Sequence, residues 1–306
     1  MDRLTASSTS KFVLPVLTAT VGFILWGSSL AMVKLAQPQC GPIFLVFARM
    51  ALALCLVSPL LFTDKFKFRV LPPRKDILLL SLLVLCEPLA AFIFEALAMR
   101  YTAASQAGMI WALGPLVYTL GGWLLFREGI SPAKGACFLA ALGGVILLTL
   151  AGGASGHAPD PMLGNFFVLL SMAGGTGFVL ILRYLRGRYN PVQIIWVQSL
   201  GATVLLLPGL LSGHIHLPVT LDAPALGALL YLTLAVTLGA QALSAFAISK
   251  VTVPTYAALS NLIPVSGVLC GLLFLGERLA PLQWLACAVV LGAVIAGQRA
   301  DSIEKI

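Results

Sequence analysis

Long apolar runs, separated by short polar segments with turn-forming residues, follow one another along the whole chain. An α-helix rises about 1.5 Å per residue, so roughly 20 apolar residues cross the hydrocarbon core of a bilayer. The pattern therefore predicts an all-α membrane protein with ten transmembrane helices. These helices are expected at residues 14–35, 42–62, 76–98, 104–126, 132–150, 164–184, 192–211, 223–247, 254–275 and 281–297.

The basic residues lie mainly between these apolar runs. If the N-terminus is cytoplasmic, fifteen Lys and Arg residues fall on the cytoplasmic side of the predicted helices. Four fall toward the outer side, namely Lys34, Arg49, Arg100 and Arg278. Basic residues concentrate on the cytoplasmic side of membrane proteins. The distribution thus predicts an inner (plasma) membrane protein with both termini in the cytoplasm, and it supports an even number of helices.

The composition agrees with lipid as the main solvent of this chain. Apolar residues make up 59% of the 306 positions and charged residues 10%, and the mean hydropathy is +1.01. A soluble domain carries about 25% charged residues. The basic residues that give the net charge of +8 lie between apolar runs, where they act as topology signals. We therefore expect no nucleic-acid partner. The six cysteines show no metal-ligand spacing, and we expect no disulfide, no metal and no cofactor.

The chain repeats itself at an offset of 149 residues without gaps. The most informative matching pairs are Pro42 with Pro191, Pro115 with Pro264, Glu128 with Glu277, and Pro132 with Pro281. Each half contains five predicted helices, an odd number, so the second half enters the membrane from the opposite side. This predicts two inverted repeats, an architecture of secondary transporters whose substrate site lies near the midplane. The expected organisation is a tail (1–13), a first repeat (14–150), a linker (151–163), a second repeat (164–297) and a tail (298–306).

Several short motifs, taken in order, resemble one known family. They are Leu-Trp-Gly-Ser-Ser at 25–29, Ala48-Arg49, Gly114-Pro115, Leu-Ser-Asn-Leu-Ile-Pro at 259–264 and Leu-Gly-Glu-Arg-Leu at 275–279. The chain is similar to the EamA-type transporters of the drug/metabolite transporter (DMT) superfamily from about residue 23 to 297. The resemblance implies a ten-helix inverted-repeat fold and efflux or exchange of small metabolites, often amino acids. The first half departs from the last motif, with Arg-Glu-Gly at 127–129.

Glu87 is the principal candidate for transport chemistry. It lies halfway along the third predicted helix, between Cys86 and Pro88. A charged side chain at that depth disfavours insertion by about 2.5–3.5 kcal/mol and usually faces a cavity or a partner. Glu87 is therefore a candidate coupling site for protons, or a counter-charge for a substrate ammonium group. The alternative is a neutral carboxyl group that is hydrogen-bonded to a neighbouring helix.

Arg49 and Glu95 are expected near the same outer end of two consecutive helices. Helices joined by a short loop are antiparallel neighbours, so the two side chains are predicted to form an ion pair with a structural role. In the alternative, Arg49 receives the carboxylate of a substrate.

Aromatic and amide side chains are expected at the same depth as Glu87. They are Trp26, Trp111, Tyr118, Gln241 and Asn261. Trp111 and Tyr118 are seven residues apart and would share one face of a continuous helix. A cavity lined by these groups would bind an aromatic or amphipathic solute, with the amides setting its orientation. Alternatively, the aromatic rings only pack between helices.

Three prolines fall within predicted helices, where each removes a backbone hydrogen bond. Pro115 and Pro264 are repeat partners and are predicted to be symmetric hinges or bends, and Pro88 should kink its own helix. The glycine-rich stretch at 173–177 should allow another helix to approach closely or the helix to unwind. Glu128 and Glu277 precede a proline that begins a helix and are expected to act in capping or in a turn salt bridge.

The sequence thus predicts a secondary transporter, not an enzyme, that moves amino acids or amphipathic amine-containing solutes by alternating access, with export as the expected direction. Its expected partners are a small-molecule substrate and the lipid bilayer, and one chain should suffice as a monomer. A transporter of sugar phosphates or nucleotide sugars is a weaker alternative, because Glu87 would repel phosphate. A membrane-embedded enzyme is also weaker, because the histidines (His157, His214 and His216) have no carboxylate cluster beside them.

Overall fold

The computed structural model describes residues 2–68, 72–127, 131–185, 188–218, 220–248, 250–251 and 253–303. Over these residues the regular elements are all helices, as predicted, with a single isolated bridge between Ser155 and Ala158. The elements are α1 (Asp2–Cys40), α2 (Pro42–Val57), η1 (Ser58–Phe62), α3 (Arg74–Val84), η2 (Leu85–Ala90), α4 (Ala91–Tyr101), α5 (Ala104–Trp111), α6 (Gly114–Phe126), α7 (Pro132–Ala151), α8 (Pro161–Leu185), α9 (Pro191–Leu211), α10 (Ala223–Tyr231), η3 (Leu232–Ala240), α11 (Gln241–Ile248), α12 (Val253–Ser260), α13 (Leu262–Leu275) and α14 (Pro281–Ile303).

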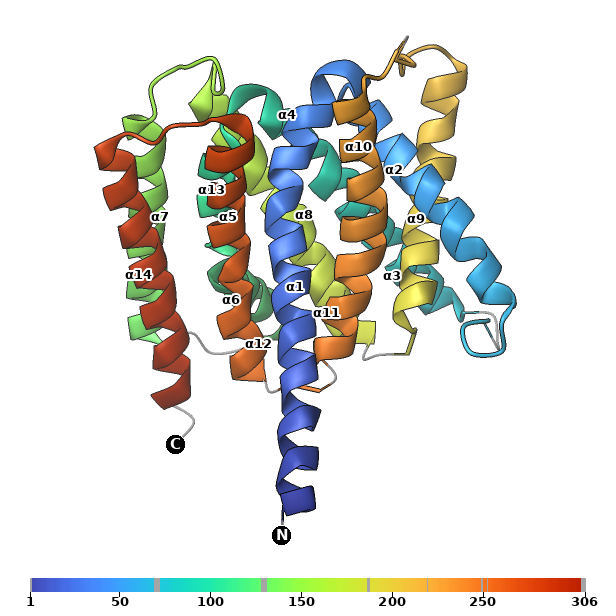
Figure 1. Cartoon of the computed structure of the whole chain (residues 1–306), viewed down its shortest axis with the longest axis horizontal. Helices are drawn as coiled ribbons and strands as arrows, with labels where there is room; N and C mark the ends of the chain where they lie inside the picture. The colour runs from blue at the N-terminus through green and yellow to red at the C-terminus, as the bar shows by residue number, and fades with distance from the viewer. Residues whose placement is uncertain are drawn as a thin grey trace.

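Every apolar run that the sequence marks as a span is helical. In the described part of the chain, seven helices are long and apolar enough to cross a membrane, and the bent pair of α5 and α6 raises this number to eight. Two more apolar helices, Gly135–Ala151 and Leu262–Leu275, are shorter. The helices stand side by side, and α1 begins and α14 ends at the same end of the molecule (Figure 1).

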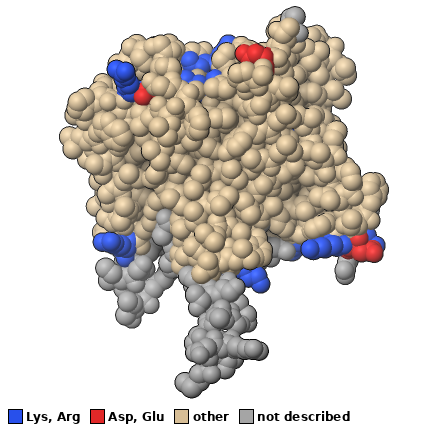
Figure 2. All heavy atoms as spheres, viewed as in Figure 1, with Lys and Arg blue, Asp and Glu red and all other residues tan. Residues whose placement is uncertain are grey.

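The surface agrees with a surrounding of lipid. Figure 2 shows charged residues gathered at two opposite ends of the molecule and a broad uncharged band between them. Large apolar side chains are exposed on the helices, among them Leu139 at 67%, Leu273 at 76% and Phe274 at 67%. Exposed apolar area of this extent needs an apolar solvent, since soluble monomers rarely carry such patches.

Four of the predicted helices are interrupted, and three of these interruptions lie at Pro88, Pro115 and Pro264, where the sequence predicts a kink or bend. The predicted helix at 104–126 bends by 44° between α5 and α6, and Pro115 lies at the first turn of α6. Its repeat partner Pro264 lies in the first turn of α13, after a break at Asn261. The predicted helices at 76–98 and 223–247 contain the π-helical segments η2 and η3. Prolines explain three of these interruptions, because each lacks the amide that would continue the hydrogen-bond ladder.

The helix boundaries recur at the offset found in the sequence. Pro42 and Pro191 begin α2 and α9, and Pro132 and Pro281 begin α7 and α14. The break between α5 and α6 corresponds to the break between α12 and α13. The two halves therefore share not only residues but also positions at which helices start and break.

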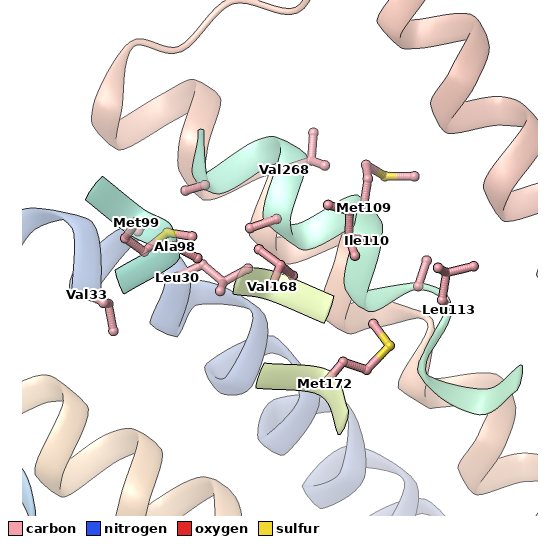
Figure 3. Close-up of a cluster of buried hydrophobic side chains, with 14 of the residues drawn as sticks. Leu30, Val33, Ala98, Met99, Met109, Ile110, Leu113, Val168, Met172 and Val268 are labelled. Atoms are coloured by element: carbon pink, nitrogen blue, oxygen red, sulfur yellow. The ribbon is translucent and has the colours of Figure 1, made fainter. Parts of the chain in front are cut away.

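The largest apolar core joins helices of both halves. Figure 3 shows Leu30 of α1, Ile110 of α5, Val168 and Met172 of α8, and Val268 of α13 in one cluster. α5 and α13 are in close contact at Gly108 and Gly267. A Cβ atom at Gly108 would lie 3.2 Å from the Cα atom of Gly267. The close approach of these two helices therefore depends on glycine at both positions, because a larger side chain would push the backbones apart.

We predict that Gly108→Leu destabilises the protein by about 1–3 kcal/mol or more, because a side chain there meets the backbone of α13 and cannot be accommodated by a rotamer change. The measurement is the melting temperature of the purified protein in detergent. Gly143→Leu is the matched control, because nothing lies within 4 Å of a Cβ atom at that exposed helical glycine. An equal melting temperature for Gly108→Leu and Gly143→Leu would contradict the assignment of a close contact between α5 and α13.

Candidate functional site

The backbone leaves the helical path at Glu87. Within the segment η2 this residue has extended dihedral angles, φ −146° and ψ 123°, and Pro88 follows it. The carbonyl oxygen of Glu87 accepts a hydrogen bond of 3.1 Å from Gln198 Nε2 of α9. A buried carbonyl outside the helical ladder needs such a partner, because lipid offers none.

The glycine-rich stretch of α8 packs against this broken segment. A Cβ atom at Gly174 would lie 2.7 Å from the carbonyl oxygen of Cys86, and one at Gly177 would lie 2.7 Å from Cys86 Sγ. Of the two roles expected for this stretch, close packing is the one observed, since α8 is continuous from Pro161 to Leu185.

Glu87 lies on a small enclosed cavity between helices of both halves. The lining residues come from α2, η2, α4, α9, η3 and α11 and are Met50, Glu87, Pro88, Phe92, Ile195, Gln198, Ser199, Thr237 and Gln241. The cavity volume is about 10 Å³, which is room for about one water molecule. The described conformation is therefore closed around the site and holds no space for a metabolite.

A chain of amide groups crosses this cavity. Gln241 Nε2 donates to Gln198 Oε1 at 3.1 Å, and Gln198 in turn donates to the Glu87 carbonyl. Ser199 is fully buried, and its hydroxyl group has no hydrogen-bond partner among the described residues. A buried hydroxyl group without a partner disfavours the closed state by about 1–3 kcal/mol, so Ser199 is available to a water molecule or a solute.

Arg49 lies immediately behind the cavity wall and is 4% exposed. Its Nε atom donates to the Thr237 hydroxyl oxygen, and its guanidinium group lies 4.1 Å from the centre of the Phe92 ring. Both Phe92 and Thr237 line the cavity. The arginine of the first half is thus held by a cation–π contact and by a hydrogen bond to the second half.

The predicted ion pair between Arg49 and Glu95 does not form as a direct contact. None of the ion pairs among the described residues joins them, since the guanidinium group is instead placed over Phe92 and against Thr237. Glu95 is 8% exposed and lies one helical turn beyond Phe92 on α4. The charges of Glu87 and Glu95 both act on Arg49 over a longer distance. The site therefore contains two carboxyl groups and one guanidinium group.

The predicted aromatic residues divide between two surroundings. The predicted shared face of Trp111 and Tyr118 is wrong, because the helix breaks and bends by 44° between them. Trp111 packs against Gly175 of α8, whereas the Tyr118 ring lies over Gly114 and within reach of the Glu87 charge.

Trp26 and Asn261 lie outside the cavity lining. The Trp26 ring is 5.8 Å from that of Phe23, which in turn lies 4.9 Å from Tyr256. Asn261 forms two hydrogen bonds with the amide of Gln298 on α14, of 3.1 and 3.3 Å. Of the residues expected together at the site, the structure thus brings Glu87 and Gln241 onto one cavity, with Tyr118 nearby.

Sequence reasoning missed Gln198, Ser199, Phe92 and Thr237. Gln198 carries the signal that singled out Gln241, a polar side chain in the middle of an apolar run, and could have been found. Phe92 and Thr237 carry no such signal, because aromatic and hydroxyl groups are common in membrane helices. In the described part of the chain, no group of three or more His, Cys, Asp or Glu residues is placed to hold a metal ion.

Apolar helices with a lipid-facing band, a helix broken at a half-buried carboxyl group and a closed cavity with polar side chains are features of membrane transporters. The sequence profile of the EamA-like transporter family matches this chain twice, over residues 13–150 and 162–296. The chain belongs to the EamA-like transporter family of the DMT superfamily.

Relatives of the chain are named as transporters. An uncharacterized transporter of Archaeoglobus fulgidus is 24% identical over 83% of this chain and 87% of its own length. The uncharacterized transporter YetK of Bacillus subtilis is 25% identical over 88% of this chain and 82% of its own length. An S-adenosylmethionine/S-adenosylhomocysteine transporter of Chlamydia muridarum is 24% identical over 61% of this chain and 58% of its own length.

A solved crystal structure has the same fold. It superposes with a TM-score of 0.63 at 18% sequence identity and covers 92% of this chain and 97% of that chain.

We predict that Arg49→Met lowers the free energy of unfolding by about 3–5 kcal/mol, because it leaves the buried Glu95 and the half-buried Glu87 without their counter-charge. Adding Glu95→Gln should restore part of this loss, because one of the two carboxyl groups is then neutral. The measurement is a double-mutant cycle of thermal unfolding with both single variants and the double variant. Strictly additive effects would show that Arg49 and Glu95 do not interact.

Proposed function

We propose that this protein is a secondary transporter that moves amino acids or other amphipathic amine-containing metabolites across the inner (plasma) membrane by alternating access, in the direction of export. The observation that carries the proposal is the position of Glu87, a carboxyl group on a closed polar cavity between the two halves of the chain.

The proposed architecture is ten transmembrane helices in two inverted five-helix repeats. It is supported by the recurrence of helix boundaries at the repeat offset and by the two matches of the family profile. The two shorter apolar helices, Gly135–Ala151 and Leu262–Leu275, then belong to the fifth and ninth of the ten spans in chain order. Both termini are proposed to be cytoplasmic, on the basis of the distribution of Lys and Arg along the sequence.

Glu87 is proposed to bind a proton and the amino group of the solute in alternation. A carboxyl group away from water favours either a proton or a cationic partner. Competition between the two for one carboxyl group couples proton movement to solute movement in opposite directions. The cavity has room for about one water molecule, so the solute enters only when the two halves separate on one side.

The substrate class follows from the charges around the cavity. Two carboxyl groups, Glu87 and Glu95, outnumber the single guanidinium group of Arg49, which favours a cationic or amine-containing solute over a phosphate. S-adenosylmethionine and S-adenosylhomocysteine, named for the Chlamydia muridarum relative, both carry an α-amino-acid group. This similarity supports the proposal of an amine-containing substrate, and it disfavours sugar phosphates and nucleotide sugars.

One chain supplies every side of the cavity, because its lining residues come from both halves. We therefore propose that the monomer is the functional unit. The energy for transport would come from a proton gradient or from exchange.

We predict that reconstituted protein takes up one class among amino acids and amphipathic amines, with saturation, and that an imposed pH gradient accelerates this uptake about tenfold or more. Glu87→Gln should abolish the acceleration, because an amide does not bind and release a proton in this pH range and so cannot alternate between a proton and the solute. Asp76→Asn is the matched control, since it makes the same change from carboxyl to amide at a buried carboxylate that pairs with Arg188 and does not line the cavity, and it should keep the response to the pH gradient. Retention of the full response by Glu87→Gln would disprove coupling through this residue.

A further inference from the structure

Glu277 is a buried carboxylate far from the cavity, at the end of the molecule that holds the loops after Cys40 and Leu275. It follows α13, which ends at Gly276 with a positive φ of 65°, and it is 4% exposed. Its Oε1 atom accepts the amide hydrogen of Ala104 at 2.8 Å, and its Oε2 atom accepts that of Ser105 at 2.9 Å. Glu277 therefore caps a helix, but this helix is α5 and not the neighbouring α14 that its position before Pro281 suggested. Glu128 lies outside the described residues.

The helix that Glu277 caps belongs to the other half of the chain. Ala104 and Ser105 begin α5, and amides at a helix N-terminus are not used by the helix itself. A carboxylate there gains both hydrogen bonds and the favourable helix dipole. Glu277 thus bonds the second half of the chain directly to the first half.

Lys34 of α1 completes this cluster. Its Nζ atom lies 3.8 Å from Glu277 Oε1 and donates hydrogen bonds to the carbonyl oxygens of Thr102 and His157. Four segments are therefore tied together by two side chains: α1, the turn before α5, the loop before α8, and the turn after α13.

Glycine makes the cluster compact. A Cβ atom at Gly271 would lie 2.5 Å from Glu277 Oε2 and 2.9 Å from the Ser105 nitrogen, so only glycine leaves space for the carboxylate. One turn away along both helices, Gly108 meets Gly267, and the neighbouring Ile110 and Val268 belong to the apolar cluster (Figure 3).

Water reaches one side of the cluster. A hollow of about 530 Å³ at this end of the molecule is lined by Lys34, His157 and Leu275, among others. The side chain of Lys34 is 13% exposed, whereas that of Glu277 is 2% exposed. The hollow thus ends at the Lys34–Glu277 pair, and the dry contact between α5 and α13 lies beyond it.

We propose that Lys34 and Glu277 form the lock that closes the transporter on its outer side. The proposal rests on the alternating-access mechanism above, because the lock joins the two halves whose separation would open the cavity. When the halves part, the adjacent hollow supplies water to the carboxylate, the ammonium group and the amides of α5. A polar lock beside water can therefore open and close without leaving a charged group unsolvated. In this proposal the Glu277 carboxylate holds α5 against the turn after α13 and does not contact the solute.

The test measures access to the cavity and does not depend on the substrate. Ser199→Cys places a thiol group on the cavity wall, in a full-length chain whose six native cysteines are replaced. The measured quantity is the rate of its reaction with a membrane-impermeant maleimide, added to one side of oriented proteoliposomes at a time. Because no transport is measured, this test can disprove the lock without disproving the proposed transport function. Likewise, absence of transport in proteoliposomes would not disprove the lock.

Glu277→Gln should raise the reaction rate from the outer side about tenfold, because the closed state loses charge-assisted hydrogen bonds to α5. Lys34→Met should act in the same direction and serves as the second variant if the first folds poorly. Asp160→Asn is the matched control, because Asp160 is an exposed carboxylate that caps only its own helix, through the amide of Leu163 at 3.1 Å. That control should leave the rate unchanged.

The side of labelling separates a lock from a general loss of stability. Opening of the outer lock raises labelling from the outer side and lowers it from the cytoplasmic side, whereas unfolding raises both. Equal rates for Glu277→Gln, Lys34→Met and Asp160→Asn would overturn the proposal, and so would an equal increase from both sides.

Discussion

Hydrocarbon offers no hydrogen-bond partner to a peptide group, and this constraint governs where the helices of this protein can break. The interruption at Glu87 and Pro88 frees a carbonyl oxygen deep within the helix bundle. Gln198 of α9 supplies the missing donor, and Gln241 of α11 supports Gln198. The break therefore brings polar groups from the second half against the first. In this way one local defect in a helix creates the polar cavity.

Broken helices also need room, and glycine provides it. Gly174 and Gly177 of α8 let the segment η2 approach to within contact of the α8 backbone. Gly108 and Gly267 do the same where α5 meets α13. Contacts without interlocking side chains hold helices close but allow them to slide or part, because no rotamer has to change. The glycines thus lie where broken helices contact their neighbours.

Buried charge is handled differently at the two polar sites. At the end of the molecule that holds the loops after Cys40 and Leu275, Glu277 is satisfied by two amides of α5 and by Lys34. At the cavity, Arg49 has one hydrogen bond and a ring contact. The carboxyl groups of Glu87 and Glu95 both interact electrostatically with it. Ser199 adds a hydroxyl group without a partner. The first arrangement is suited to holding a closed state, and the second leaves capacity for a proton or a solute.

The sequence by itself determined the helical class, the approximate positions of the apolar helices in the described part of the chain and the repeat offset, because hydrophobic runs and prolines act locally. It also identified Glu87 and Gln241, since polar groups within apolar runs are conspicuous. The contacts of Arg49 with Phe92 and Thr237, the separation of Trp111 from Tyr118, and the pairing of Asn261 with Gln298 could not be read from it. These depend on how each helix bends and rotates against its neighbours. Only the tertiary structure decides this, because packing between helices far apart in the sequence has no local signal.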